Sequence, residues 1–252
     1  MDEKVNLLER EIVRLRVCIL ALMLLLPLAL VGAGTREWQN ASFNQITVRR
    51  LNLVDENGAL RLAISNAQNF PPPMMHGKPF GVGMRSGGGS PSFVFYNADG
   101  DEQGGFRWGG GGSSGGKFDQ FMSLSEDQFR QNDDLMLSFN DSNEDRTAGL
   151  TGDEQPDTTP LDLLTHQLNT AVLAGKTDAE KAAIRQQFVN EHFTGRHQFF
   201  VGYNPGGSML KLYDKTGHLR ILLAVDAKTG EPTLEFLDAT GNVTSHQGPI
   251  LR

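Results

Sequence analysis

One short pattern, repeated along the chain, constrains its fold more than any other feature. Between Met209 and Val243, the apolar residues Leu210 and Leu212 alternate with others up to the turn Asp214–Gly217, and the alternation resumes at Leu219. A period of two on both sides of a turn predicts a β-hairpin. The Asp side chain opens a type I turn by hydrogen-bonding its own backbone, and Gly takes the left-handed conformation that closes it.

The same pattern recurs, with two alternating apolar residues before an acidic or amide residue that opens a turn. The further copies are Leu51 and Leu53 before Asp55–Gly58, Phe93 and Phe95 before Asn97–Gly100, Leu137 and Phe139 before Asp141, and Leu234 and Phe236 before Asp238–Gly241. The copy at Asp141 is the weakest, because Glu144 stands where glycine is expected. Phe106 and Trp108 fit the apolar face if their strand pair is two residues longer. Either antiparallel hairpins in general or an internal duplication explains the recurrence, and both predict a mainly β, antiparallel hairpin or meander domain.

The N-terminal segment, residues 1–16, is polar with a helical pattern, and we interpret it as a cytoplasmic amphipathic helix. Its apolar residues follow a heptad spacing that extends past residue 16: Val5, Leu8, Ile12, Leu15, Ile19 and Leu22. β-Branched residues at one core position and Leu at the other are typical of parallel two-stranded coiled coils. The segment is therefore either a self-associating helix or a solitary helix leading into a membrane.

Residues 17–35 form a leucine-rich run without a charged side chain. A helix of this length is just sufficient to cross a hydrocarbon core of about 30 Å. Arg14 and Arg16 on the near side favour an N-terminus in the cytoplasm. A cleavable signal peptide is the alternative, with Val31 and Ala33 at suitable small-residue positions. Both interpretations export the bulk of the chain, and we favour a retained anchor in a bacterial inner membrane with a periplasmic domain.

The exported part is divided by its composition. Residues 36–45 resemble a stalk, residues 46–158 are the first part of the β domain, residues 159–195 change to a helical period, and residues 196–252 are the second part. In the helical segment, Thr177 and Glu180 have the spacing of a capping box, which predicts a helical hairpin inserted between strands.

Two irregular segments stand out in the first part of the β domain. Residues 66–79 contain three consecutive prolines, and we predict a loop that either contacts a partner or covers one end of the core. Of the 29 glycines in the chain, 14 lie in residues 81–116. The run after Trp108 is therefore either a mobile loop or a segment packed closely against another backbone.

Composition excludes some classes of protein. The formal net charge is −7, and no cluster of Lys and Arg with interleaved aromatic residues suggests a nucleic-acid surface. Cys18 is the single cysteine, so no intrachain disulfide can form, although its position at the predicted membrane boundary would suit acylation.

No motif predicts catalysis, a cofactor or a metal. The sequence around Gly175 lacks the first glycine of a phosphate-binding loop, and Gly111–Gly115 matches a nucleophile elbow only because it lies in a glycine run. Asp141, Asn143 and Asp145 have calcium-loop spacing without the required Gly and Glu. His192 and His197 lack a third ligand nearby. We assign no catalytic, cofactor-binding or metal residue.

An N-terminal anchor followed by hairpins of this kind resembles a group of bacterial, N-terminally anchored proteins with repeated strand–DxxG–strand units. The resemblance covers about half the chain and transfers no functional residue. We predict a non-enzymatic, single-pass membrane protein whose β domain is an accessory or scaffold subunit of a larger complex or a homo-oligomer. The alternatives are a glycan- or cell-wall-binding module that stacks ligands on Tyr96, Phe106, Trp108 and Tyr203, and an exported hydrolase.

Overall fold

The structure is a computed structural model that describes residues 10–17, 19–21, 23, 42–81, 90–113, 115–155, 158–193 and 195–248. The chain divides into two compact units, Met1–Thr47 and Val48–Arg252. In the first unit, the described residues between 10 and 23 are helical. No helix among the described residues combines the length and apolar character that crossing a bilayer requires. Residues 24–35 of the predicted membrane segment lie outside the described residues.

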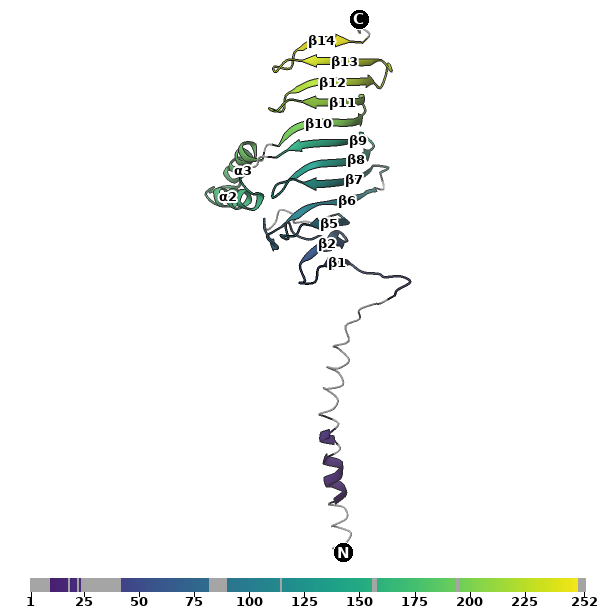
Figure 1. The fold of residues 1–252 in the computed structure, drawn as a ribbon, viewed down its shortest axis with the longest axis vertical. Coiled ribbons are helices and arrows are strands. Elements are labelled where there is room, and N and C mark those ends of the chain that lie inside the picture. The colour runs from purple at the N-terminus through teal and green to yellow at the C-terminus, as the bar shows by residue number, and fades with distance from the viewer. Residues whose placement is uncertain are drawn as a thin grey trace. The chain divides into compact units, whose positions relative to one another are not determined.

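The second unit is built on one antiparallel sheet of 12 strands whose spatial order follows the chain (Figure 1). The strands are β1 (Arg50–Val54), β2 (Leu60–Ser65), β5 (Ser92–Tyr96), β6 (Glu102–Gly112), β7 (Phe118–Asp127), β8 (Asp133–Ser142), β9 (Arg146–Glu154), β10 (Arg196–Asn204), β11 (Gly207–Tyr213), β12 (Leu219–Asp226), β13 (Pro232–Leu237) and β14 (Val243–Gln247). The predicted mainly β, antiparallel fold is thereby confirmed. The sheet is an open meander, because no pairing among the described strands joins β1 to β14.

The hairpin turns form as the sequence predicts at four of the five copies. In each, the backbone N–H of the glycine donates to the carbonyl of the residue that opens the turn, and the glycine has a positive φ: 83° at Gly58, 79° at Gly100, 83° at Gly217 and 85° at Gly241. The fifth copy is shifted by one residue. Asp141 stays in the strand opposite Arg146, and the turn begins at Ser142, whose N–H bonds the Asp145 carbonyl.

The segment between β2 and β5 covers part of the sheet. It contains a short 3-10 helix, Ala67–Asn69, the three prolines, and a small hairpin of β3 (Met74–Met75) and β4 (Lys78–Pro79). Pro71 and Met75 are buried, and Phe70 and Met74 pack against the buried cluster of Ala63, Val94 and Tyr96. The structure therefore shows the proline loop covering the core, the second of the two roles expected for it.

Two helices, α2 (Leu161–Leu173) and α3 (Asp178–His192), lie between β9 and β10 (Figure 1). Thr177 caps α3 by accepting the Glu180 N–H, and Glu180 accepts the Thr177 N–H in return. The start of α2 is held to the β7–β8 turn, because the Leu161 N–H donates to the Arg130 carbonyl. The sheet continues past the helices, since β9 pairs directly with β10.

The glycine run after Trp108 is the second half of β6, paired with β7. Two glycines in β6 have positive φ and no space for a side chain. A Cβ at Gly104 would lie 2.2 Å from the Ser125 carbonyl oxygen, and one at Gly110 would lie 2.2 Å from that of Asp119. Within this run the structure shows close packing at Gly109 and Gly110, whereas a Cβ at Gly111 or Gly116 would meet nothing within 4 Å.

Candidate functional site

The two faces of the sheet differ sharply in chemistry. We define the apolar face by one continuous row of cross-strand partners, with one residue from each strand between β1 and β13: Leu51, Ile64, Phe93, Phe106, Leu124, Leu137, Leu150, Val201, Leu210, Leu223 and Leu234. Directly opposite residues have Cβ atoms about 5 Å apart, so these side chains form an uninterrupted strip. Shorter runs flank it, such as Leu212, Ile221 and Phe236.

The apolar face is open to solvent in the isolated chain. Among the described residues, the strands make extensive contacts only with their hydrogen-bonded neighbours, so the sheet is a single layer. Side chains on this face remain 37–59% exposed: Leu51, Leu53, Trp108, Phe118, Leu124, Leu135, Leu137, Val201, Tyr203, Leu212, Leu223, Val225 and Phe236. The other exposed large apolar residues in the sheet are Val54 and Val243, both beside register shifts. Alternation thus concentrates the exposed apolar surface on one face.

Charged side chains in the middle of the strands lie on the second face, the one that carries Ala63 and Val94, whereas those on the apolar face, such as Glu126 and Asp141, lie near strand ends. Arg107 lies there opposite Ser92 and Ser123, and Lys211 lies there opposite Phe200 and Leu222. Glu235 and His246 form a pair on the same face, 3.3 Å apart. The middle of the apolar face is therefore free of charge, a property expected of a surface that becomes covered.

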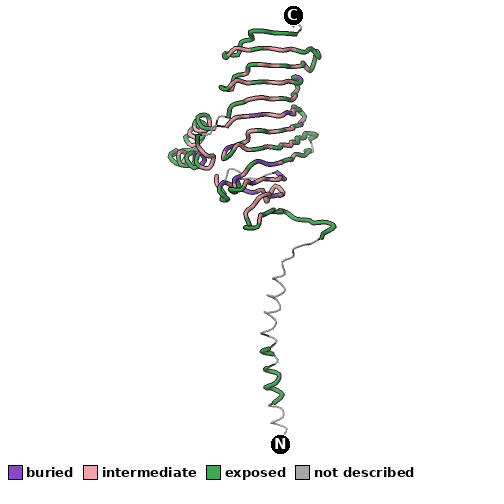
Figure 2. Tube along the Cα trace, in the orientation of Figure 1, coloured by how far each residue is buried: buried purple, intermediate pink, exposed green. Residues whose placement is uncertain are grey.

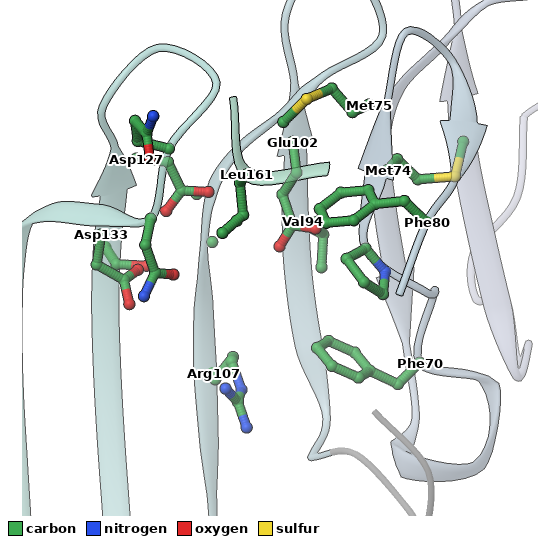
Figure 3. Close-up of a pocket in the computed structure, with 16 residues that line it drawn as sticks. Phe70, Met74, Met75, Phe80, Val94, Glu102, Arg107, Asp127, Asp133 and Leu161 are labelled. Atoms are coloured by element: carbon green, nitrogen blue, oxygen red, sulfur yellow. The ribbon is translucent and has the colours of Figure 1, made fainter. Parts of the chain in front are cut away.

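A cavity of about 160 Å³ lies on the second face, beneath the proline loop (Figure 3). Phe70, Met74 and Phe80 form its apolar side, while Glu102, Arg107, Asp127 and Asp133 contribute charge. The Arg107 guanidinium lies 5.4 Å from the centre of the Phe70 ring, and its Nε donates to the Ser90 hydroxyl. The arginine thus fastens the loop to the sheet.

The size and lining of this cavity limit its chemistry. Pockets that hold drug-sized ligands span about 300–1,000 Å³, so this one suits a few water molecules or a very small solute. The described lining residues include no His, Cys or Lys. No group of three or more potential metal ligands occurs within the described part of the chain. The cavity offers neither an activated nucleophile nor a metal cage.

The most constrained polar group is Asp101, whose side chain is fully buried beside the cavity. It accepts hydrogen bonds from the His76 N–H at 2.6 Å, Arg130 Nε at 3.2 Å and Asn97 Nδ2 at 3.4 Å. His76 and Arg130 are the two non-glycine residues with positive φ in the described segments, at 52° and 57°. One carboxylate therefore joins the β3–β4 hairpin, the β5–β6 turn and the β7–β8 turn.

The ionisation of Asp101 follows from this environment. Burial alone would raise its pKa, but hydrogen bonds from the His76 N–H, the Arg130 guanidinium and the Asn97 amide outweigh burial and hold the pKa below its usual range. Asp101 is consequently a carboxylate at neutral pH, and its negative charge is part of the fold. We interpret it as a structural residue because its oxygens are directed at the chain itself.

A second polar group involves His197, which sequence reasoning considered only as a metal ligand. Its Nδ1 lies 2.6 Å from Asp153 Oδ1, and its ring centre lies 5.4 Å from that of Tyr213. Burial, followed by the charge of Asp153, raises the pKa of Tyr213. An Asp–His pair orients an imidazole for base catalysis, but no Ser, Thr or Cys bonds His197 within the described residues, so the arrangement lacks a nucleophile.

The aromatic residues that could stack a glycan are only partly brought together. Phe106 and Trp108 lie on the apolar face with ring centres 5.3 Å apart, and Phe93 lies 5.8 Å from Trp108. Tyr203 shares this face on the distant strand β10, whereas Tyr96 is buried on the second face. The three neighbouring rings are tilted by 31–50° and do not form one flat platform.

The other motifs considered in the sequence have structural partners. Asp141 is held by Arg146, and Asn143 bridges to the backbone of Gly116 and Phe118, so neither is turned toward a common cation. Gly175 lies in the turn between α2 and α3. The His192 ring packs against the Phe188 ring with centres 4.4 Å apart and planes tilted by 49°.

Comparison with protein-family models, curated proteins and solved structures finds no match for this chain.

Proposed function

We propose that this protein is a non-enzymatic scaffold that takes part in a protein assembly through the apolar face of its sheet. The observation that carries the proposal is the continuous strip from Leu51 to Leu234, uncharged and open to solvent in the isolated chain. A large apolar side chain that is about 40–50% exposed leaves roughly 80 Å² open to solvent, so the partly exposed set on this face presents apolar surface on the order of 1,000 Å². The largest apolar patch on a typical monomer covers about 300–600 Å². A surface larger than this marks a contact site.

The proposal also includes a membrane anchor at the N-terminus. A retained membrane helix within residues 17–35 would hold the N-terminus in the cytoplasm and the β domain outside it, in a bacterial inner membrane and periplasm. The charge-free run of residues and the flanking Arg14 and Arg16 support this topology. The bilayer and one or more protein subunits are then the partners, with no role for nucleic acid.

The test compares adjacent leucines that point to opposite faces of β12. Leu223 lies on the apolar face, and Leu222 lies on the second face between Lys211 and Glu235. We expect the full-length protein to copurify with partner subunits from gently solubilised membranes. Leu223→Asp should abolish the association, because it places an unpaired charge in the interface, and Leu222→Asp should retain it. A protein that is monomeric and alone in its native membrane would contradict the proposal.

The cluster of Phe93, Phe106 and Trp108 favours a second candidate, a glycan- or cell-wall-binding module. Exposed aromatic rings bind sugars by stacking, and Trp108 is partly exposed. We expect Trp108→Ala to abolish binding on a glycan panel if this candidate is correct. Binding that survives the substitution would exclude these residues, and an absence of binding would leave the scaffold proposal as the stronger one.

A further inference from the structure

We propose that the partner covering the apolar face is a second copy of this chain, arranged in parallel so that the two apolar faces pack against each other. This inference rests on the proposed function and identifies the occupant of that surface. Three observations support it: the dimensions of the face, its lack of charge, and a second self-complementary surface in the N-terminal unit.

The dimensions restrict the partner. At about 4.8 Å between neighbouring strands, a sheet of 12 strands extends roughly 50 Å from β1 to β14. The apolar strip follows almost this entire extent, from Leu51 in β1 to Leu234 in β13. A partner must therefore present an equally long and equally apolar surface. A copy of the same sheet meets both conditions, and two sheets pack face to face at about 10 Å.

The area is also sufficient. A standard protein interface buries about 800 Å² on each partner, and obligate homodimer interfaces are more apolar than transient ones. The exposed part of the apolar face reaches this size without any contribution from its half-buried members, such as Ile64, Phe93 and Leu210. Burial of this surface against a copy would convert a single layer into a two-layer sandwich with an interior.

The distribution of charge favours a copy over a charged or amphipathic partner. The strand charges Arg107, Lys211 and Glu235 all lie on the second face. The charges on the apolar face lie near the strand ends. Asp141 pairs with Arg146 at 3.0 Å, and Glu154 pairs with Arg196 at 2.9 Å. Glu126, opposite Leu135, accepts a hydrogen bond from Gln103 Nε2. Two such faces can therefore meet along their central rows, from Leu51 to Leu234, without burying a charge.

The N-terminal unit supplies an independent reason for parallel alignment. The heptad positions Ile12, Leu15 and Ile19 lie in its helix and are 44%, 60% and 49% exposed. Together with Val5, Leu8 and Leu22 in the sequence, they form a seam of the kind that pairs parallel helices. The chain thus carries two apolar surfaces, a heptad row in the N-terminal segment and the strip on the sheet, and each would pair with its own copy in a parallel dimer.

Cross-linking with matched cysteines tests this inference in the full-length protein. In a Cys18→Ser background the chain is free of cysteine, and single cysteines replace Leu137 or Leu223 on the apolar face. The controls are Met136→Cys and Leu222→Cys, which lie next in sequence and on the opposite face. A short bismaleimide is added to intact native membranes, and the products are sized by denaturing gel and mass spectrometry.

Leu137→Cys and Leu223→Cys should each yield a cross-linked species made only of this chain, while the controls remain monomeric. A membrane-impermeant maleimide should label the apolar-face cysteines about tenfold or more slowly than the controls, because an interface protects them. Cross-linking of the apolar face to a different protein would overturn the inference and leave the scaffold proposal intact. Apolar-face cysteines that label as fast as the controls without cross-linking would overturn both.

Discussion

Strands β1–β6 and strands β10–β14 have the same hairpin chemistry but differ in how they are buried. In the first group the proline loop covers the second face, and Ala63, Val94 and Tyr96 are buried beneath it. In the second group Gly207 is the single buried residue between residues 196 and 248, and the strands are open on both sides (Figure 2). The apolar face is nevertheless continuous through both groups.

Apolar side chains occur in the sheet for two different reasons: the chain itself covers them on the second face, and a partner would cover them on the apolar face. On the second face, apolar residues such as Val94 are buried where the chain itself covers the sheet, where Arg107 also contacts the covering loop. Where the chain does not cover this face, Lys211 and Leu222 are only partly buried. On the apolar face, large apolar residues occur throughout, although the described chain covers neither end of it. Whatever covers that face must extend across both groups of strands, which agrees with a partner as long as the sheet.

The largest expected effect lies in the covered group. Asp101→Ala removes a buried carboxylate and leaves the partly buried Arg130 and the His76 N–H without their acceptor. We expect the free energy of unfolding to fall by about 3–5 kcal/mol, as measured by urea denaturation. Asp99→Ala is the matched control, since its exposed carboxylate also contacts Arg130 at 3.5 Å and should matter little. Similar losses for both variants would contradict the central role of Asp101.

We expect Asp101 to contribute to the loss of folding stability at low pH. The pKa of Asp101 is lower in the folded protein than its ordinary value of 3.8. Its charged form therefore adds stability above that value, and this contribution disappears as the pH falls through the folded-state pKa. We expect Asp101→Asn to flatten the stability profile below about pH 4 relative to the wild type. An unchanged slope in urea denaturation across that range would contradict the assignment.

In the open group, the adjacent leucines of β12 provide a test with opposite outcomes for a monomer and an assembly. In the isolated chain Leu223 is 45% exposed and Leu222 is half-buried, so a monomer would lose more stability from Leu222→Asp. If the apolar face is covered, the order reverses, and Leu223→Asp should cost about 2 kcal/mol more than Leu222→Asp. Thermal unfolding in native membranes measures both variants. A larger loss of stability from Leu222→Asp than from Leu223→Asp would mean that the apolar face is not covered.

The smallest effect is expected from shortening the sheet. Deletion of residues 232–252 removes β13 and β14, which contact only neighbouring strands. By analogy with repeat proteins, the loss should raise amide hydrogen exchange in β12 and leave β2 and β5 unchanged. Mass spectrometry of peptic fragments would show the pattern. Increased exchange at Val94 would mean that the two groups of strands are stabilised together.

The sequence predicted the parts of this fold that depend on neighbours in the chain. The turns at Asp55, Asn97, Asp214 and Asp238 follow from a side-chain acceptor and a glycine three residues later, an interaction contained within a few residues. The capping box of α3 is local in the same sense. The copy at Asp141 was placed one residue early, because Ser142 provides the side-chain acceptor and Asp141 bonds Arg146.

The parts that the sequence did not predict depend on distant segments. Alternation shows that one face of each strand is apolar but does not reveal what that face contacts, so the single layer could not be distinguished from a barrel or a sandwich. Gly109 becomes part of a strand because β7 pairs with it and the Phe121 ring lies against it. The role of Asp101 was missed because its partners His76 and Arg130 lie 25 and 29 residues away.

The consecutive order of the strands has a consequence for how such a protein can change over time. Because strands β10–β14 contact mainly the strands beside them, one more hairpin there would lengthen the sheet by about 10 Å and leave every existing turn in place. Insertion or loss of a unit is therefore tolerated more readily than in a closed barrel, where the strand number fixes the radius. The number of hairpins sets the reach of the domain, and related chains of different length could span different distances with the same local chemistry.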